Sequence, residues 1–193
     1  KCTLMPYLYS KAVVAHERGV PMLRAMVLEY PQDRMCRYLD LQYMLGDALL
    51  VSPVFRESGE VEYYLPEGRW VHLLDNRVVQ GGQWLKENYE YMSLPLFVRQ
   101  NHILVTGCRN DVPDYDYTED FTVVIPEFED GAKSSCSLIT EEGEKATTIT
   151  AVREGTKIVV DVPGNFRWNI KKIGDEPQRV EKDKQRAILI LEE

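Results

Sequence analysis

The sequence predicts a mainly β protein, with two antiparallel β-sandwich domains that follow a single N-terminal helix. Three observations lead to this prediction. Apolar residues recur at helical spacing in residues 3–18. After Gly19, short apolar or alternating runs separated by turn residues are typical of strands. A polar stretch at 106–120, with Gly107, Asn110 and Pro113 as breakers and four aspartates, predicts a junction between two groups of strands.

The helix is predicted over residues 3–18. Thr3 can cap its start, and Pro6 lies in the first turn, where a missing N–H is tolerated. The sequence Arg18-Gly19-Val20-Pro21 predicts its end, with a cation, a glycine cap and then a proline. The following segment offers no partner for the apolar face, so we expect an adhesive surface there. That face comprises Leu4, Leu8, Ala12 and Ala15, with Tyr7 and Val14 beside it.

Strand patterns dominate residues 21–105, which we predict to form the first β-sandwich. The continuous apolar run at 48–55 is expected of a strand buried on both faces. The breaker sequence Pro66-Glu67-Gly68 lies between two strand patterns and predicts a hairpin. The predicted elements are a strand at 22–28, a helical turn at 33–37, a strand at 48–55, a hairpin at 61–74, turns at 75–76 and 81–82, and strands within 94–105.

Residues 106–193 are predicted to form the second sandwich. Strand patterns recur there at intervals of roughly 8–12 residues, as in antiparallel sandwiches. Good turn sequences separate them at Glu154-Gly155-Thr156 and at 162–165. The predicted strands lie at 121–125, 135–140, 146–152, 157–162, 165–173 and 186–191.

The charge and hydropathy of the chain exclude several classes of partner. The net charge is −8 and the pI is about 5.0. An acidic chain repels phosphate backbones, so we expect no nucleic-acid binding. No polybasic run predicts binding to an anionic membrane, and no apolar run approaches the roughly 20 residues of a membrane span. The sequence leaves open whether the chain forms a homo-oligomer.

The cysteines and the N-terminus indicate the cellular compartment and the origin of the chain. Its four cysteines are widely spaced and include no Cys-x-x-Cys pair, so we expect reduced thiols in a cytoplasmic protein. The chain starts at Lys1-Cys2-Thr3, with neither a signal sequence nor an initiator Met. This start is expected of a segment taken from a longer protein.

Two acidic clusters are candidates for chemical sites. Asp111, Asp114, Asp116, Glu119 and Asp120 form the densest one, but it lacks the calcium-loop pattern with its turn glycine. A solvated linker is the favoured interpretation, with a Ca²⁺ site as the alternative. Residues 141–144 form a charged sequence typical of a hairpin tip.

Histidines, hydroxyls and aromatic residues give weaker signals. His16, His72 and His102 lie far apart, and none forms a ligand pair at helical spacing. Ser52 follows a buried strand and is expected to be structural. Trp70 and Trp168 alternate within strands, which predicts burial, although stacking on sugar stays open for each tryptophan. The best stacking candidates lie near loops, and they are Trp84, Tyr89 and Tyr91.

An ordered series of segments resembles the C-terminal part of glycoside hydrolase family 31. The most informative segment includes Gly46-Asp47-Ala48-Leu49-Leu50-Val51-Ser52-Pro53. The Arg24-Ala25-Met26 sequence and Leu65-Pro66-Glu67-Gly68-Arg69-Trp70 are similar to the bacterial α-xylosidase branch. The matching segments are 4–9, 19–26, 29–33, 39–54, 65–73, 93–99 and 113–117.

The resemblance implies a domain organisation and an activity. Residues 1–20 would be the last helix of a (β/α)8 catalytic barrel, 21–105 a proximal β-sandwich and 106–193 a distal one. The parent enzyme would be a retaining α-glycosidase acting on terminal α-linked xylose or glucose, with its own upstream barrel as this chain's partner.

No catalytic residue is carried over to this sequence. The barrel takes ~250 residues and cannot fit, and no counterpart of the family's nucleophile motif is present. We therefore expect no catalytic residue, cofactor or metal ligand in these residues, and no activity of the chain alone. The alternatives are a free carbohydrate-binding module and an interaction protein built on β-sandwiches.

Overall fold

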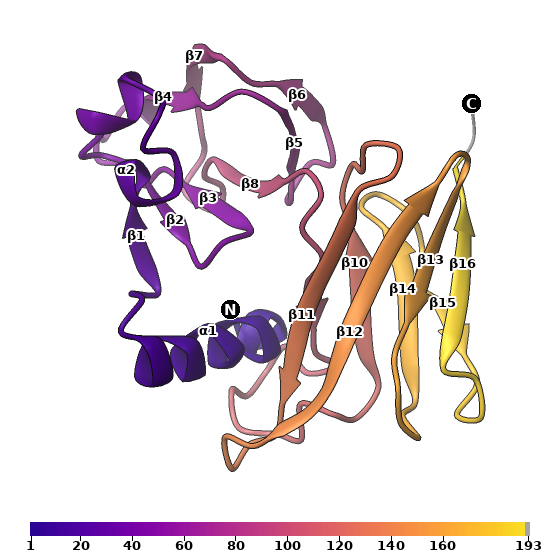
Figure 1. Ribbon diagram of the computed structural model, residues 1–193. Helices are drawn as coiled ribbons and strands as arrows, with labels where there is room; N and C mark the ends of the chain where they lie inside the picture. Colours follow the sequence, from indigo (N-terminus) through magenta and orange to yellow (C-terminus); the bar gives the residue numbers. More distant parts are fainter. Residues whose placement is uncertain (192–193) are drawn as a thin grey trace. The chain divides into compact units, whose positions relative to one another are not determined.

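The computed structural model describes residues 1–191 and shows a mainly β chain with antiparallel sheets and one long helix, as predicted (Figure 1). The chain forms two compact units. One comprises Pro21–Gln100, and the other comprises Lys1–Val20 together with the residues from Asn101 onward. The division at Gln100 precedes the predicted boundary at 105 because the strand β9 (Leu104–Thr106) pairs with a strand of the second unit.

The Pro21–Gln100 unit contains a six-stranded antiparallel sheet and a two-stranded ribbon. The sheet has the order β1-β2-β3-β8-β5-β6. Its core is formed by side chains such as Met26, Met44, Tyr63, Trp70 and Phe97. The strands are β1 (Leu23–Ala25), β2 (Tyr43–Leu45), β3 (Leu49–Val51), β8 (Leu96–Arg99), β5 (Arg69–His72) and β6 (Val78–Gln80), with β4 (Glu60–Leu65) and β7 (Gln83–Asn88) in the ribbon.

The strand predicted at 22–28 is interrupted. β1 ends at Ala25, and the short helix α2 (Met26–Glu29) follows. A charged contact closes this turn, since Arg24 Nη1 donates to Glu29 Oε1 at 2.6 Å. Met26 is fully buried, whereas Leu23 and Leu28 each expose 60% of their surface, so the apolar run contributes to the core mainly through Met26 at the start of the helix. The helical turn predicted at 33–37 exists as η2 (Met35–Arg37), and Asp33 Oδ1 accepts a hydrogen bond from the Met35 N–H.

The hairpin predicted at 61–74 is wrong. β4 pairs with β7, whereas β5 pairs with β6 and β8. The turn sequence at 66–68 does not close a short hairpin. It bends the outgoing half of a longer hairpin between β4 and β5, and the returning half bends beside it between β6 and β7. Gly81 N donates to Gly68 O, and Gly82 N donates to Leu65 O, both at 2.7 Å. The hairpin closes at the predicted turn near Asn76, whose positive φ of 65° suits a tight turn.

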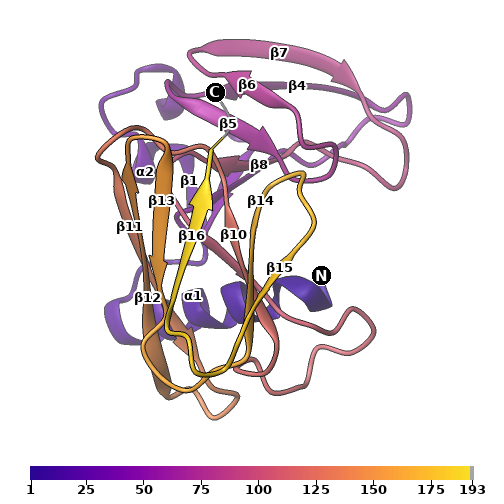
Figure 2. The same cartoon turned by 90° about the vertical axis from the view of Figure 1, so that its right-hand side faces the viewer.

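The second unit is a sandwich of two four-stranded sheets. One sheet has the order β15-β14-β10-β9 and the other β11-β12-β13-β16 (Figure 2). One pair departs from the antiparallel prediction, because β10 and β14 run parallel with Phe121 opposite Trp168. The further strands are β10 (Phe121–Ile125), β11 (Lys133–Ile139), β12 (Lys145–Glu154), β13 (Lys157–Asp161), β14 (Trp168–Lys172), β15 (Gln178–Val180) and β16 (Arg186–Ile190).

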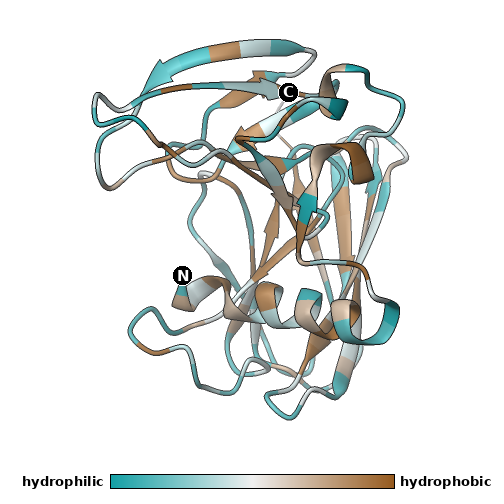
Figure 3. Cartoon of the chain, turned by 90° about the vertical axis from the view of Figure 1, so that its left-hand side faces the viewer, coloured by the Kyte–Doolittle hydropathy of each residue, from teal (hydrophilic) through white to brown (hydrophobic). Residues whose placement is uncertain are grey.

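The core of this sandwich consists of inward-facing apolar side chains from both sheets. Examples are Val123, Ile149, Ile158 and Trp168, each at most 1% exposed. Apolar stretches gather in the strands and polar ones in the connecting loops (Figure 3). This alternation of buried and exposed positions is the signal that made the strands predictable.

Helix α1 (Met5–Arg18) belongs to the second unit, where it contacts β9 and β11 (Figure 1). Its end at the left-handed Gly19 was predicted. The predicted Thr3 cap was wrong, because the 3-10 turn η1 (Cys2–Leu4) precedes the helix and no side chain caps it. None of the helices formed by residues 1–191 is both long and apolar enough to cross a membrane.

The buried side of α1 overlaps the predicted apolar face only at its edge, where Tyr7 is buried. Its buried residues are Pro6, Tyr7, Ser10 and Lys11. Leu8 and Ala12, on the other side, are only partly buried. The helix therefore has one face that packs in this unit and a second, more apolar face that this packing leaves partly exposed.

Candidate functional site

The acidic run at 111–120 is used in local contacts. Arg109 binds Asp111 through two hydrogen bonds of 2.8 Å each, and they lower the pKa of Asp111 to about 2. Asp116 Oδ1 accepts hydrogen bonds from the Thr118 N–H at 2.8 Å and from its hydroxyl at 2.7 Å. These are the contacts of a structured, solvated loop.

The remaining acidic groups lie apart. Asp120 faces Arg167 at 3.9 Å and Arg179 at 3.6 Å. Glu141 and Glu142 are exposed at the turn between β11 and β12, as predicted for a hairpin tip. Within residues 1–191, no three His, Cys, Asp or Glu side chains lie in positions that could hold a metal ion.

The three histidines occupy separate environments. His16 is exposed and His102 is half-buried, whereas His72 is 1% exposed. The His72 ring lies 3.1 Å from the Leu94 carbonyl through Nε2 and accepts from the Asp75 N–H through Nδ1 at 3.2 Å. It therefore fixes the turn after β5.

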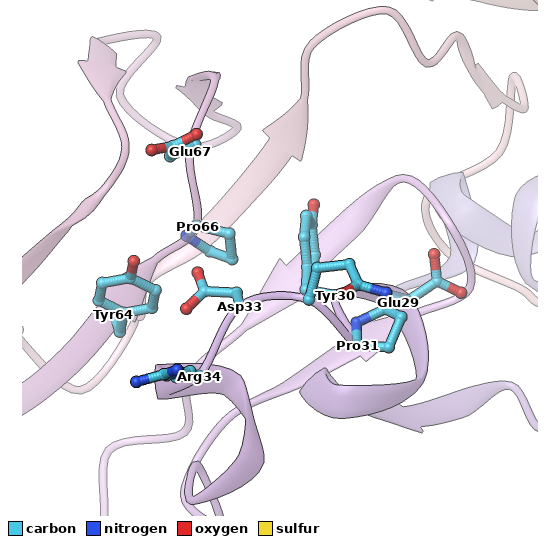
Figure 4. A pocket seen from close by; sticks show the side chains of 9 residues that line it. Glu29, Tyr30, Pro31, Asp33, Arg34, Tyr64, Pro66 and Glu67 are labelled. Atoms are coloured by element: carbon cyan, nitrogen blue, oxygen red, sulfur yellow. The ribbon is translucent and has the colours of Figure 1, made fainter.

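A pocket of about 520 Å³ lies beside the loop that follows α2 (Figure 4). Its polar groups mainly hold the loop, because Glu29 binds Arg24 and Asp33 binds the Met35 N–H. Burial and then the neighbouring Asp33 raise the pKa of Tyr64 to about 12, so this hydroxyl stays protonated. The lining residues are Glu29, Tyr30, Pro31, Gln32, Asp33, Arg34, Tyr64, Pro66 and Glu67.

A second polar pocket, of about 370 Å³, lies over a network centred on Glu87. The Glu87 carboxylate accepts from Arg77 Nη1 at 2.5 Å and Nη2 at 2.6 Å, from Tyr63 at 2.6 Å and from Tyr89 at 2.8 Å. The Arg77 hydrogen bonds, above all, lower the pKa of Glu87 to about 2. This network was not predicted from the sequence because its members lie far apart in it. Tyr63 is on β4, Arg77 is in the turn before β6, and Glu87 and Tyr89 are at the end of β7 and just after it.

The tryptophans separate into buried and exposed residues. Trp70 and Trp168 are each 1% exposed, as their alternation predicted, and their indole N–H groups donate to Pro66 O and Lys184 O. Trp84 is 45% exposed. The structure therefore excludes sugar stacking for the two core tryptophans and retains Trp84.

The two tyrosines that were grouped with Trp84 differ from each other. Tyr89 is half-buried and belongs to the Glu87 network, which occupies its hydroxyl. Tyr91 is fully exposed, at 100%. Neither lines the surface beside Trp84.

Trp84 lines a shallow groove of about 190 Å³, which we call the Trp84 groove. The Trp84 ring lies against Tyr64, its partner across the ribbon, with ring centroids 5.6 Å apart. Phe55 and Leu41 expose 71% and 58% of their surface in the same groove. The lining residues are Leu41, Pro53, Phe55, Arg56, Glu60, Val61, Glu62 and Trp84.

Charged side chains surround these apolar groups. Glu60 pairs with Arg56 and lies 3.0 Å from Lys86 Nζ. The hydrogen bond from Lys86 lowers the pKa of Glu60, so that carboxylate stays ionised and acts only as an acceptor at neutral pH. The groove thus combines aromatic surface with fixed donors and acceptors.

Two family descriptions match the sequence. Residues 19–104 match the glycosyl hydrolase family 31 C-terminal domain. Residues 116–192 match the C-terminal domain of alpha-xylosidase YicI. Between them these matches span most of both units.

The curated relatives are much longer than this chain. Alpha-xylosidase XylQ of Lactiplantibacillus pentosus is 36% identical over 85% of the chain and 22% of the relative. An alpha-xylosidase of Emericella nidulans is 35% identical over 59% of the chain and 16% of the relative. The chain therefore spans less than a quarter of the length of either protein.

Solved structures show the same fold. A family 31 dextranase of Flavobacterium johnsoniae, solved with glucose, has a TM-score of 0.75 and 26% identity over 88% of this chain and 24% of that one. An alpha-xylosidase of Xanthomonas citri has a TM-score of 0.79 and 22% identity over 99% of this chain and 24% of that one. Helix α1 and both units are therefore included in the likeness to the second structure.

Proposed function

Because the chain belongs to glycoside hydrolase family 31 and carries its C-terminal domains, we propose that it supports a retaining α-glycosidase. The parent enzyme would release terminal α-linked xylose from oligosaccharides. The match of residues 116–192 to an α-xylosidase C-terminal domain, together with the similarity to XylQ, supports xylose over glucose. Glucose is the second candidate because α-glucosidases also match residues of this chain.

The proposed partner is the enzyme's own upstream catalytic barrel. Helix α1 has the surface for this role, because one side is buried in the second unit through Tyr7 and Lys11. Leu8, Ala12 and Ala15 on the other side are partly exposed. An apolar helix face of this kind gains stability by packing against another element.

The chemistry would take place in that barrel. Retaining hydrolysis needs two carboxyl groups about 5–5.5 Å apart across the scissile bond, in a rigid cleft. In the densest acidic cluster of the sequence, Asp111 and Asp116 are held by Arg109 and Thr118 in an exposed loop. The proposed function of this chain is therefore support of the barrel, without hydrolysis by the chain alone.

Hydrolysis of p-nitrophenyl-α-xyloside tests the proposal in two purified proteins. One is this chain, and the other is extended N-terminally to the length of the relatives. We expect activity in the longer protein alone, with a higher kcat/KM for the xyloside than for the glucoside. Activity of the shorter chain would overturn the proposal, and Asp111→Asn and Asp116→Asn would then locate its source. An inactive, folded longer protein would favour a free carbohydrate-binding module.

We also propose a cytoplasmic location. Cys2, Cys36 and Cys108 are free thiols, which supports a reducing compartment. Labelling with a membrane-impermeant thiol reagent in intact and lysed cells tests this. Labelling of the exposed Cys108 before lysis would contradict it.

A further inference from the structure

The Trp84 groove presents an aromatic side chain in a fixed, half-exposed position. Trp84 on β7 stands opposite Tyr64 on β4, and the 7% exposed Tyr64 ring supports one side of it. The Tyr64 N–H donates to Gln42 Oε1 and Gln42 Nε2 donates to Tyr64 O, each at 2.8 Å, and this pair of hydrogen bonds anchors the support. The remaining surface of the indole is open to a ligand.

One face of the ribbon carries both aromatic and charged groups. Glu60 and Glu62 alternate with the buried Val61, so they lie on the same side of β4. Lys86 stands opposite Glu62 and next to Trp84 on that side of β7. The Trp84 ring thus lies beside carboxylate acceptors and an ammonium donor.

We propose that the Trp84 groove binds a neutral pyranose unit of an α-linked oligosaccharide. This inference rests on the proposed function, since the substrate would be the same class of sugar. A pyranose ring has an apolar C–H face, which packs on an indole, and hydroxyls at its rim. Carboxylates accept hydrogen bonds from these hydroxyls, and guanidinium and ammonium groups donate to them.

The charges of the groove fit a neutral ligand. Arg56 and Lys86 are balanced by Glu60 and Glu62, so neither sign predominates. A nucleic acid or an anionic membrane requires an excess of positive charge, which is absent from this cluster. The centre of a protein interface is depleted of charged residues, whereas here they border the aromatic ring.

The size of the groove sets the expected affinity. About 190 Å³ is below the range of drug-sized pockets, so it accommodates one sugar ring with the rest of the oligosaccharide outside. A ligand that contacts the protein through roughly ten heavy atoms of one ring binds with a dissociation constant in the millimolar range. Such a site would hold an oligosaccharide near the enzyme rather than sequester it.

The test follows the three indole N–H signals of this chain by NMR during titration with isoprimeverose and isomaltotriose. We expect the Trp84 signal to shift with saturation in the millimolar range, while those of the buried Trp70 and Trp168 stay unchanged. Sorbitol serves as a control because it has hydroxyls but no rigid C–H face. The proposal would be overturned if the Trp84 signal did not move with about 50 mM isoprimeverose and did not move with about 50 mM isomaltotriose.

Variants separate stacking from general surface effects. Trp84→Ala should weaken binding by about tenfold or more, and Glu62→Ala by roughly threefold to tenfold. Binding to these variants is followed by chemical shifts of backbone amides in the ribbon. Tyr91→Ala removes a fully exposed aromatic residue outside the groove and should change nothing.

The outcome is independent of the hydrolysis assay. Sugar binding without xyloside hydrolysis in the longer protein would overturn the proposed function and leave the groove as a sugar site. Hydrolysis with no Trp84-dependent sugar binding would overturn the groove proposal alone. Trp84-dependent self-association in sedimentation, with no effect of saccharide, would identify the groove as an interface between copies and would equally overturn it.

Discussion

Replacing Glu87 by Gln removes the centre of the network that joins β7 to the rest of the Pro21–Gln100 unit. The carboxylate accepts four hydrogen bonds, two from Arg77 and one each from Tyr63 and Tyr89. A glutamine has one acceptor oxygen, and its amide would face donors. The charge-assisted, bidentate contact with Arg77 would be lost.

The expected cost is about 2–3 kcal/mol in the free energy of unfolding. A hydrogen bond to a charged group contributes roughly 1.5–3 kcal/mol, and these four are coupled rather than additive. The 24% exposure of the Glu87 side chain and the 37% exposure of Arg77 reduce the value below that of a buried ion pair. The same hydrogen bonds lower the pKa of Glu87 from 4.5 to about 2, which corresponds to about 3 kcal/mol before solvent screening is discounted.

The sign of the pH dependence follows from this lowered pKa. The ionised carboxylate is favoured in the folded state, so its contribution is fully present above pH 4.5. It is lost as the pH falls through 4.5 toward about 2, where the folded wild-type chain also binds a proton. The difference between wild type and Glu87→Gln should therefore be largest at pH 7 and shrink in acid.

Urea unfolding between pH 3 and 7, followed by the NMR signal of the Trp70 indole in the same unit, measures this difference. Glu62→Gln is the matched control, because Glu62 is exposed on the neighbouring strand and should change stability by less than about 0.5 kcal/mol. A Glu87→Gln cost below about 0.5 kcal/mol at pH 7, or one that grows in acid, would refute the reasoning.

Two further predictions concern α1 and the bent hairpin. Tyr7→Ala should lower the free energy of unfolding of the second unit by about 3 kcal/mol because Tyr7 is 3% exposed, whereas Leu8→Ala should lower it by less than about 1 kcal/mol. Equal costs in urea unfolding would contradict a helix with one buried and one partly exposed side. Gly81→Ala should cost more than about 2 kcal/mol of stability, because the added Cβ would overlap the Pro66 carbonyl. Gly131→Ala should cost about 1 kcal/mol, because Gly131 has a φ of +76° but no atom within 4 Å of the added Cβ. Thermal unfolding of the two variants tests this order.

The sequence predicted those elements whose pattern is local. The strands at 121–125 and 157–162 were predicted nearly to the residue, because buried and less buried positions alternate along 157–161 and residues 123–125 form a continuous apolar run. The short β15 (Gln178–Val180) was missed, since only Val180 of its three residues is buried. A three-residue edge strand carries too few apolar positions to form a pattern.

Pairing between strands was harder to predict than the strands themselves. The turn chemistry of Pro66-Glu67-Gly68 is compatible with a closed hairpin and with a bend. The choice depends on Gly81 and Gly82, which lie more than ten residues away and let the returning strand approach Leu65 and Gly68. The parallel pairing of β10 with β14 depends likewise on contacts between distant segments.

The candidate site shows the same limit in a different form. Periodicity correctly predicted that Trp70 and Trp168 would be buried, and proximity to loops correctly favoured Trp84 as the exposed residue. The sequence pattern did not place Phe55, Glu60 or Glu62 beside Trp84. The pairing of β4 with β7 brings the two glutamates there, and Phe55 reaches the groove from the loop before β4. The Tyr89 hydroxyl, favoured equally by position, is committed to Glu87.

Helix α1 was predicted correctly as an element, but the side of it that packs was not. Its spacing predicts one apolar face that needs a partner, and deletion of residues 1–20 would then reduce aggregation. In the structure the side that carries Tyr7, Ser10 and Lys11 is buried instead, and Leu8 and Ala12 are only partly buried. Thr3 O accepts from Gly107 N, and Cys2 O accepts from the Tyr115 hydroxyl. Deletion would uncover β9 and β11 and remove these hydrogen bonds, so it should promote aggregation instead. The N-terminal segment is thus part of the second unit's own fold, and its outer face remains free to join another domain.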